Sequence, residues 1–194
     1  MKVRDRGGED MKNKPDFNRF LEGERIYLRE VRPSDINEIY YRWMNDPEVT
    51  RYLETRFYPN STEGLREYAA GKLGDRQNVF LAIVLKQGDR HIGNIKLGAI
   101  NWIHRYADVG LMIGEKDCWG KGLATEAIRL VTEYAFKTLN LRRLTAGCYD
   151  ANMGSAKAFL KAGWQQEGIR KSHFYSNGTY VDDILLGIVR SEND

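Results

Sequence analysis

The feature that most constrains the fold is a long amphipathic helix pattern over residues 123–139. Its small and apolar side chains recur at the helical period and form one stripe: Ala124, Ala127, Ile128, Val131, Ala135 and Leu139. Such a stripe has to be buried against another layer of structure. A strand pattern at 107–113 precedes it, and a polar, glycine-bearing connection at 117–122 joins the two. This order favours a sheet that carries helices.

The other patterns alternate along the chain and predict a mixed sheet domain of the α/β (α+β) class. Strands are expected at 25–31, 79–85, 91–97, 107–113, 144–149, 164–170 and 180–189, with a hairpin turn at 87–89. Helices are expected at about 34–45, 62–73, 123–139 and 153–161. Ser34 or Asp35 is the expected cap of the first helix. The expected inward faces of the first two helices are Ile36, Ile39, Tyr40 and Trp43, and then Leu65, Tyr68, Ala69 and Leu73.

The length of 194 residues fits one domain, expected over residues 20–194. Residues 1–19 are rich in charged, Asn and Gly residues that bury little surface, so a mobile tail is expected there. A net charge of +3 is too small to indicate nucleic-acid binding. No apolar run approaches the ~20 residues of a membrane span, and no signal-peptide core is present, so a cytoplasmic location is expected.

The cysteine pattern gives no indication of a metal centre or a disulfide framework. Cys118 and Cys148 are not in a CxxC spacing and have no histidine cluster beside them. We therefore expect two reduced structural thiols and no metal site.

The stretch Cys118-Trp119-Gly120-Lys121-Gly122-Leu123-Ala124-Thr125-Glu126-Ala127 is the chief candidate for a ligand site. Backbone amides at the start of a helix have no partner within the helix, and the helix dipole adds positive potential there. Glycines let an anion approach the backbone closely, which suits a pyrophosphate. The spacing matches neither the phosphate loop of NTPases nor the dinucleotide fingerprint. A glycine-rich helix start that binds nothing is the competing interpretation.

A second stretch extends the pattern: Tyr149-Asp150-Ala151-Asn152-Met153-Gly154-Ser155, followed by Lys161-Ala162-Gly163-Trp164. Together with the first stretch and with Trp43-Met44-Asn45-Asp46-Pro47, it resembles the GNAT acetyltransferase superfamily. The resemblance covers about residues 21–190. It is closest to the branch that contains the ribosomal-protein N-terminal acetyltransferases and many small-molecule relatives.

The resemblance implies acetyl-CoA as co-substrate, bound where two central strands splay apart. The residues implied for the pyrophosphate are Trp119, Gly120, Lys121, Gly122, Ala124 and Thr125. Met112 and Ile113 would pair with the pantetheine arm, Asn152 would hydrogen-bond it, and Ser155 would lie near the thioester sulfur. The sequence departs from the family at Phe159, where many members carry a tyrosine that protonates the thiolate. The acid role then falls to Ser155, to water or to no group.

The reaction implied is attack of a neutral amine on the thioester, which needs a base for a strongly basic amine. An amine of pKa about 10.4 costs roughly 4 kcal/mol to deprotonate at neutral pH, and an α-amine costs under about 1 kcal/mol. Asp108 is the candidate base, and a solvated carboxylate at a strand end is the competing interpretation. His104 is interpreted as a solvated loop residue. Glu126 is interpreted as a carboxylate that stabilises the helix dipole.

Three functions stay open at this point. The leading one is acetylation of a small-molecule amine such as an amino sugar, with Trp43, Trp102, Tyr52 and Tyr58 as stacking candidates. The sequence shows no acidic cluster that would indicate polyamines. The second is acetylation of a protein or peptide N-terminus, and the third is acyl-CoA binding without catalysis. Trp43, Asn45 and Glu48 are the candidate contacts to the acceptor, and a homodimer is a further expectation from the resemblance.

Overall fold

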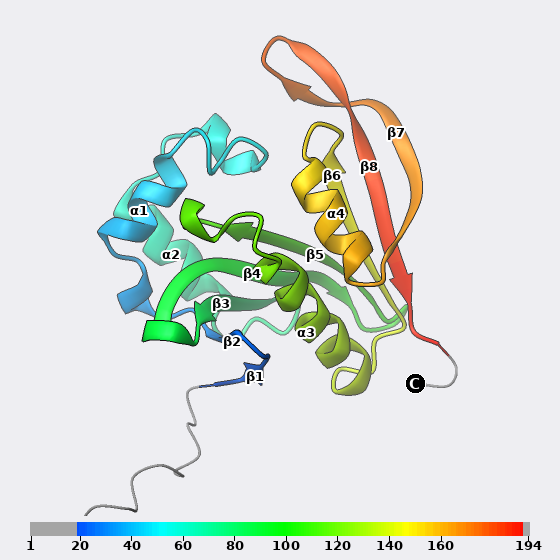
Figure 1. Cartoon of the computed structure of the whole chain (residues 1–194), viewed down its shortest axis with the longest axis horizontal. Helices are drawn as coiled ribbons and strands as arrows, with labels where there is room; N and C mark the ends of the chain where they lie inside the picture. Colours follow the sequence, from blue (N-terminus) through cyan, green and yellow to red (C-terminus); the bar gives the residue numbers. More distant parts are fainter. Residues whose placement is uncertain (1–18, 192–194) are drawn as a thin grey trace, which may run out of the picture.

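The computed structural model describes residues 19–191, which form one eight-stranded sheet in the order β1-β2-β3-β4-β5-β6-β8-β7 (Figure 1). The strands are β1 (Leu21–Glu22), β2 (Ile26–Glu30), β3 (Val79–Leu85), β4 (Arg90–Asn101), β5 (Tyr106–Ile113), β6 (Arg143–Tyr149), β7 (Gln165–Ser176) and β8 (Thr179–Val189). All neighbours are antiparallel except β5 and β6. The mixed α/β sheet predicted from the sequence is confirmed.

Helices cover both faces of the sheet. They are α1 (Glu38–Asn45), α2 (Thr62–Lys72), α3 (Leu123–Lys137) and α4 (Met153–Lys161), with short 3-10 turns η1 (Pro33–Asp35), η2 (Glu54–Phe57), η3 (Gln87–Asp89) and η4 (Lys116–Cys118). The buried stripe of α3 packs with α4 on Ile83, Ile95 and Leu144. On the other face α1 and α2 pack on Ala82 and Val84. Alternate residues of one strand therefore supply two separate cores.

The pairing of β5 with β6 is unusually short. It comprises three rungs, Tyr106–Arg143, Ala107–Leu144 and Asp108–Thr145. Beyond Asp108 the two strands diverge, and Figure 1 shows β6, β8 and β7 rising away from β5. The splayed strands expected from the family resemblance are present, and the gap between them lies in the middle of the sheet.

Several local predictions were wrong. The cap of α1 is Asn37, whose Oδ1 accepts hydrogen bonds from the amides of Ile39 and Tyr40 at 2.9 and 3.2 Å. Asp35 lies in η1, and its carboxylate is already bound elsewhere. Ile39, Tyr68 and Leu73, expected to face inward, are exposed, because these short helices bury only a narrow stripe. The strand expected at 164–170 runs on to Ser176 as one arm of a long hairpin.

Two predictions about location keep their status. The expected tail at 1–19 lies almost entirely outside the described residues. Within residues 19–191 no helix is long and apolar enough to cross a membrane, and the cytoplasmic location stays a prediction. Cys118 and Cys148 are both buried free thiols.

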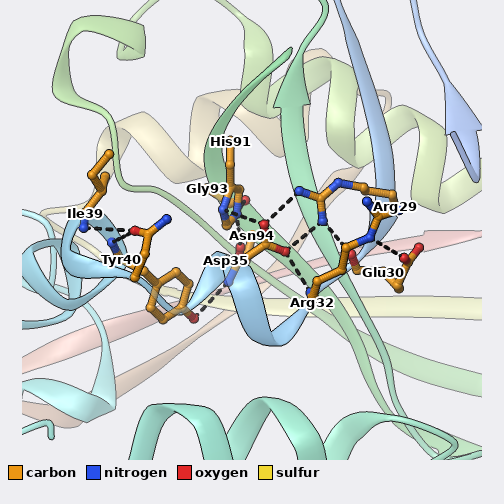
Figure 2. A network of polar contacts seen from close by, with 10 residues as sticks. Arg29, Glu30, Arg32, Asp35, Ile39, Tyr40, His91, Gly93 and Asn94 are labelled. Atoms are coloured by element: carbon orange, nitrogen blue, oxygen red, sulfur yellow. Dashed lines mark hydrogen bonds and ion pairs between the residues drawn. The ribbon is translucent and has the colours of Figure 1, made fainter. Parts of the chain in front are cut away.

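A buried polar network fastens α1 to the sheet (Figure 2). The Arg29 guanidinium on β2 donates to both oxygens of Asp35 at 2.7 and 2.8 Å. On β4, His91 Nε2 lies 2.7 Å from Asn94 Oδ1, and Asn94 Nδ2 donates to the Tyr40 hydroxyl of α1 at 2.9 Å. Since the partners come from β2, η1, β4 and α1, the network fixes where α1 lies over the sheet.

The charge states in this network follow from burial and hydrogen bonding. Burial by itself raises the pKa of Asp35, but the hydrogen bonds from Arg29 and the Arg32 amide outweigh it and lower the pKa overall. Burial lowers the pKa of His91. At neutral pH the Arg29–Asp35 pair is therefore ionised and His91 is neutral.

We expect Asp35→Asn to lower the free energy of unfolding by about 3 kcal/mol, because it leaves the buried Arg29 charge unpaired. Denaturant unfolding at pH 7 measures the change. Because the pKa of Asp35 is lower in the folded than in the unfolded protein, the ion pair contributes its full stability above the unfolded pKa, near 3.9. This contribution is lost as the pH falls through the folded pKa. Wild type and variant should therefore converge in acid.

Glu30→Gln is the matched control, because it breaks the more exposed Arg32–Glu30 pair on the same segment. A surface pair of this kind contributes under about 1 kcal/mol. Equal losses in the two variants would contradict the anchoring role of Asp35.

Candidate active site

A cavity of about 480 Å³ opens at the gap between β5 and β6. Four segments line it: the end of β5 at 111–113, the turn at 118–125, the start of α4 at 152–158, and the loop at 48–53. The gap thus joins the face that carries α3 and α4 to the loop that follows α1. A ligand that lies in this cavity can reach from one face of the sheet to the other.

The turn into α3 has the geometry of an anion site. Gly120 and Gly122 adopt positive φ angles of 70° and 77°, a region that glycine occupies without steric cost. Gly122 is the cap residue and offers no side-chain oxygen to the helix. The first bond of the helix ladder runs from Glu126 N to Gly122 O, so the helix gives the amides of Ala124 and Thr125 no partner.

Glu126 holds this turn in place. Its Oε1 accepts the amides of Arg25 and Ile26 at 2.8 and 3.2 Å, and its Oε2 accepts Arg25 Nε at 3.0 Å. Arg25 Nη1 also donates to the Lys121 carbonyl at 2.8 Å. The side chain of Glu126 therefore ties the start of α3 to β2, in keeping with the structural interpretation of this residue.

The residues predicted for the pyrophosphate lie together at this turn. Trp119, Gly120, Gly122, Ala124 and Thr125 all line the cavity, whereas Lys121 is exposed beside it. The Trp119 indole donates to the Ile113 carbonyl at 2.7 Å, which fixes the ring against the end of β5.

The residues predicted for the cofactor arm lie at the end of β5 and at the start of α4. Met112 and Ile113 line the cavity on β5, and Asn152 and Ser155 line it on α4. Asn152 caps α4, since its Oδ1 accepts the Ser155 amide at 3.2 Å. The Asn152 amide group then remains as a hydrogen-bond donor. Phe159, by contrast, is buried in the core against Trp164, with ring centroids 4.7 Å apart.

Asp108 lies at the last rung before the strands part. Its Oδ2 accepts the Thr145 hydroxyl at 3.3 Å. The side chain keeps some exposed surface, yet the surrounding protein is dense enough that burial raises the pKa of the carboxyl, and the Thr145 hydrogen bond only partly offsets this. Asp108 lines neither the cavity at the gap nor the larger one beside the β7–β8 hairpin, but it lies where the strands part, and a carboxyl with a raised pKa is a better proton acceptor than one with its ordinary pKa.

A second cavity, of about 940 Å³, lies between the loop after α1 and the tip of the β7–β8 hairpin. Its lining includes Asn45, Glu48, Arg51, Tyr58 and residues 175–178. Glu48 and Arg51 also line the first cavity, so the two spaces meet at these side chains. Glu48 is held by Lys116 at 2.6 Å.

Trp43 lies in the core, as its place on the inward face of the first helix predicted, and does not take the acceptor-contact position that was the other expectation for it. It is buried under α1, its indole donates to Glu115 at 2.9 Å, and Gly114 leaves room for its ring. It lines neither cavity. Trp102 lies on a separate apolar hollow with Val79 and Leu139. Of the three predicted acceptor residues, the structure therefore brings Asn45 and Glu48 to the cavities and leaves Trp43 in the core.

Sequence analysis missed most of the loop between α1 and α2. Arg51 and Leu53 line the first cavity beside Tyr52, which was named only as a stacking candidate, and these residues follow no periodic pattern that would reveal their place. Lys157 and Lys161 also line it. Their spacing of four residues on a predicted helix would have placed both on one face of it. Within residues 19–191 no three His, Cys, Asp or Glu side chains gather as a metal-binding group.

The comparisons with known proteins agree with this geometry. Residues 25–165 match the family described as the acetyltransferase (GNAT) domain. The chain is 33% identical to the spermidine N(1)-acetyltransferase of Escherichia coli, over 86% of this chain and 87% of that protein. It is 31% identical to the uncharacterized N-acetyltransferase YoaA of Bacillus subtilis, over 88% of this chain and 96% of that protein. The structure of the spermidine N-acetyltransferase of Vibrio cholerae in complex with CoA and spermine aligns with a TM-score of 0.77 and 25% identity, over 85% of this chain and 95% of that one.

The turn at Gly120 gives a direct test of the anion site. We expect Gly120→Asp to weaken binding of acetyl-CoA at least tenfold, because a carboxylate would lie against the pyrophosphate at a cost of roughly 1–3 kcal/mol. Isothermal titration measures the affinity, and the loss should shrink with added salt.

Gly120→Asn is the control, since Asn has the same shape and also tolerates positive φ. A Cβ at Gly120 meets nothing within 4 Å, whereas one at Gly122 lies 3.5 Å from Arg25, which would partly neutralise an added charge. Similar affinities in Gly120→Asp and Gly120→Asn would exclude this turn as the pyrophosphate site.

Proposed function

The chain belongs to the GNAT family of N-acetyltransferases, and we propose that it moves the acetyl group of acetyl-CoA to a primary amine of a small molecule. The observation that carries the proposal is the gap between β5 and β6, which connects an anion-binding turn on one face with a second, larger cavity on the other. A donor and an acceptor can enter from opposite faces and meet between the strands.

The donor side is assigned to the turn and the two strand ends. The amides at 120–125 suit the pyrophosphate, and Lys157 and Lys161 add positive charge on the facing helix. Residues 111–113 present backbone groups along the cleft, where an amide-bearing arm can hydrogen-bond as a strand does. Acetyl-CoA supplies the activated acyl group, and the protein holds its carbonyl in place.

The chemical step is proposed to need a proton acceptor at Asp108 and an oxyanion site on the backbone of β5. Asp108 lies where the strands part, so its carboxylate can take the proton of the attacking amine. Backbone amides that face the gap can stabilise the tetrahedral oxyanion. Phe159 is in the core and has no acidic proton, so Ser155, which lines the cleft, is proposed to lie beside the departing thiolate.

The acceptor is proposed to be a small molecule that enters through the second cavity and whose amine reaches Asp108, which lies outside the lining of that cavity. Asn45 shapes this cavity, since its side chain bonds the Tyr41 and Asn60 carbonyls at 3.0 and 3.2 Å. Tyr58 and Tyr52 line the cavities and are the two aromatics left for stacking on a sugar ring. Since Trp43 and Trp102 lie elsewhere, support for an amino sugar is weaker than the sequence indicated. The similarity to spermidine acetyltransferases supports an aliphatic amine instead.

The proposal is tested by incubating the purified protein with acetyl-CoA and an amine panel of diamines, amino sugars and peptides with free α-amines. Thiol release and the mass of the product report transfer. We expect turnover with at least one small amine. Turnover confined to peptides would favour the N-terminal acetyltransferase alternative, and acetyl-CoA binding without transfer to any amine would favour a non-catalytic module.

We expect Asp108→Asn to lower kcat/KM about a hundredfold for an alkylamine, because a strongly basic amine has to lose a proton. The loss should be much smaller for an α-amine of low pKa. Steady-state rates over pH measure both effects. Equal losses for the two amines would contradict the role of Asp108 as base.

Thr145→Val is the companion variant. It keeps the carboxyl but removes a hydrogen bond that lowers its pKa, so the acidic limb of the pH–rate profile should move to higher pH while the plateau is kept. An unchanged limb would show that Asp108 does not control it.

A further inference from the structure

The acceptor face of the sheet carries two carboxyl groups near the gap. Asp108 of β5 is paired with Thr145 of β6, and Asp183 of β8 is paired with Tyr149 of β6. Directly opposed residues project to the same face, so all of these side chains lie on the side of α1 and α2. The donor cleft is lined by α3 and α4 on the opposite side, so an acceptor approaches the gap over these carboxyl groups.

Two glycines leave the floor between the carboxyl groups open. Gly110 of β5 and Gly147 of β6 lie on this same face, and both are exposed. A Cβ added at Gly147 would lie 2.8 Å from Asp183 Oδ1. Asp183 therefore leans across β6 toward the gap, through space that any side chain at Gly147 would fill.

Asp183 has an unused acceptor. The residue is 1% exposed, and within residues 19–191 its Oδ1 is the one buried side-chain oxygen or nitrogen without a hydrogen-bond partner. Its Oδ2 lies 3.4 Å from Arg170 Nε. A buried carboxylate oxygen without a donor is unfavourable, and an N–H donor delivered to Oδ1 would remove that penalty.

We propose that Asp183 Oδ1 binds the distal ammonium group of a diamine or polyamine acceptor whose reacting amine lies at Asp108; this rests on the proposed function. Asp108 is level with Thr145, and Asp183 Oδ1 is level with Gly147. The two positions are roughly 7 Å apart along β6 and one strand spacing, about 4.8 Å, apart across it, so they are separated by roughly 8 Å, a span that a short alkyl chain bridges.

Burial raises the pKa of Asp183, and the neighbouring Arg170 and His173 lower it in part, so a bound ammonium would have to favour the charged form in competition with these groups. Lys96 and Arg170 lie close enough to lower the pKa of Asp108, and Asp183 raises it, although burial is the largest cause. The side chain of Arg170 is 54% exposed and is the neighbour with room to move aside for a ligand. An ammonium at Asp183 would also favour the ionised, proton-accepting form of Asp108.

The test compares putrescine with butylamine, which has the same carbon chain and lacks the second ammonium. Titration of the full-length protein saturated with CoA measures their affinities. We expect putrescine to bind at least tenfold more tightly than butylamine. The amino alcohol of the same chain length is expected to bind like butylamine, and if it binds like putrescine the ammonium assignment is overturned.

Asp183→Asn is expected to abolish the preference for putrescine and to leave butylamine within about twofold, with folding checked by thermal melting. Asp182→Asn is the matched control, because Asp182 lies on the opposite face of β8 and pairs with Lys171. Gly147→Ala is a second route to the same result, since its methyl group would block the path to Oδ1 without removing the charge.

The outcomes separate this subsite from the proposed function. A putrescine preference that persists in Asp183→Asn and Gly147→Ala, or that wild type lacks, overturns the subsite even when acetyl transfer occurs. A putrescine preference that both variants lose supports it. If that preference is present and no amine is acetylated, the proposed function fails and the subsite stands.

Discussion

The hydrogen bonding between β5 and β6 stops after Asp108 and Thr145, and the rest of the site depends on that stop. A parallel pair that continued would close the sheet and leave no passage between its faces. Because the strands part, the turn before α3 and the start of α4 border the same opening. The sheet is continuously hydrogen-bonded on either side of the gap, so β5 and β6 are held rigidly even though they do not pair beyond Asp108 and Thr145.

The site is built from groups that the protein leaves unsatisfied, and its surroundings hold these groups in place. The turn at 120–122 uses positive φ angles and an uncapped helix start, while Glu126 and Arg25 bind it to β2. The loop after α1 has little apolar burial of its own, yet Arg56 joins it to the Tyr149 hydroxyl and to the Tyr175 carbonyl at 3.0 Å each. The hydrogen bonds of Glu126, Arg25 and Arg56 beside the cleft thus position the turn and the loop, whose own residues make few contacts inside the cleft.

The sequence predicted the residues around the first cavity far better than those around the second, and the reason is the range of the interactions. The helix at 123–139 and the glycines before it are neighbours along the chain, so local periodicity and helix-end chemistry were enough to place them. Asp183 is far from Asp108 in sequence, and only the β6–β8 pairing brings its side chain to the gap. The cap of α1 was misplaced for a similar reason, since Arg29 competes for Asp35 across a turn that no helix rule describes. The sequence was compatible with Trp43 in the core or in contact with the acceptor. In the structure the Trp43 indole donates to Glu115, which holds the ring in the core.

The gap also has a consequence for what can pass through it. A break in the middle of a sheet creates two inner strand edges, and edges of this kind attract other extended chains. Here the edges are recessed behind α3, α4 and the loop at 48–53, and the Trp119 indole occupies the last carbonyl of β5. A folded partner or a second sheet is too wide to reach them, whereas a thin flexible chain that carries its own amides can thread between them. The width of the opening between the parted strands therefore limits the cross-section of a ligand that can enter, before any side chain contacts it.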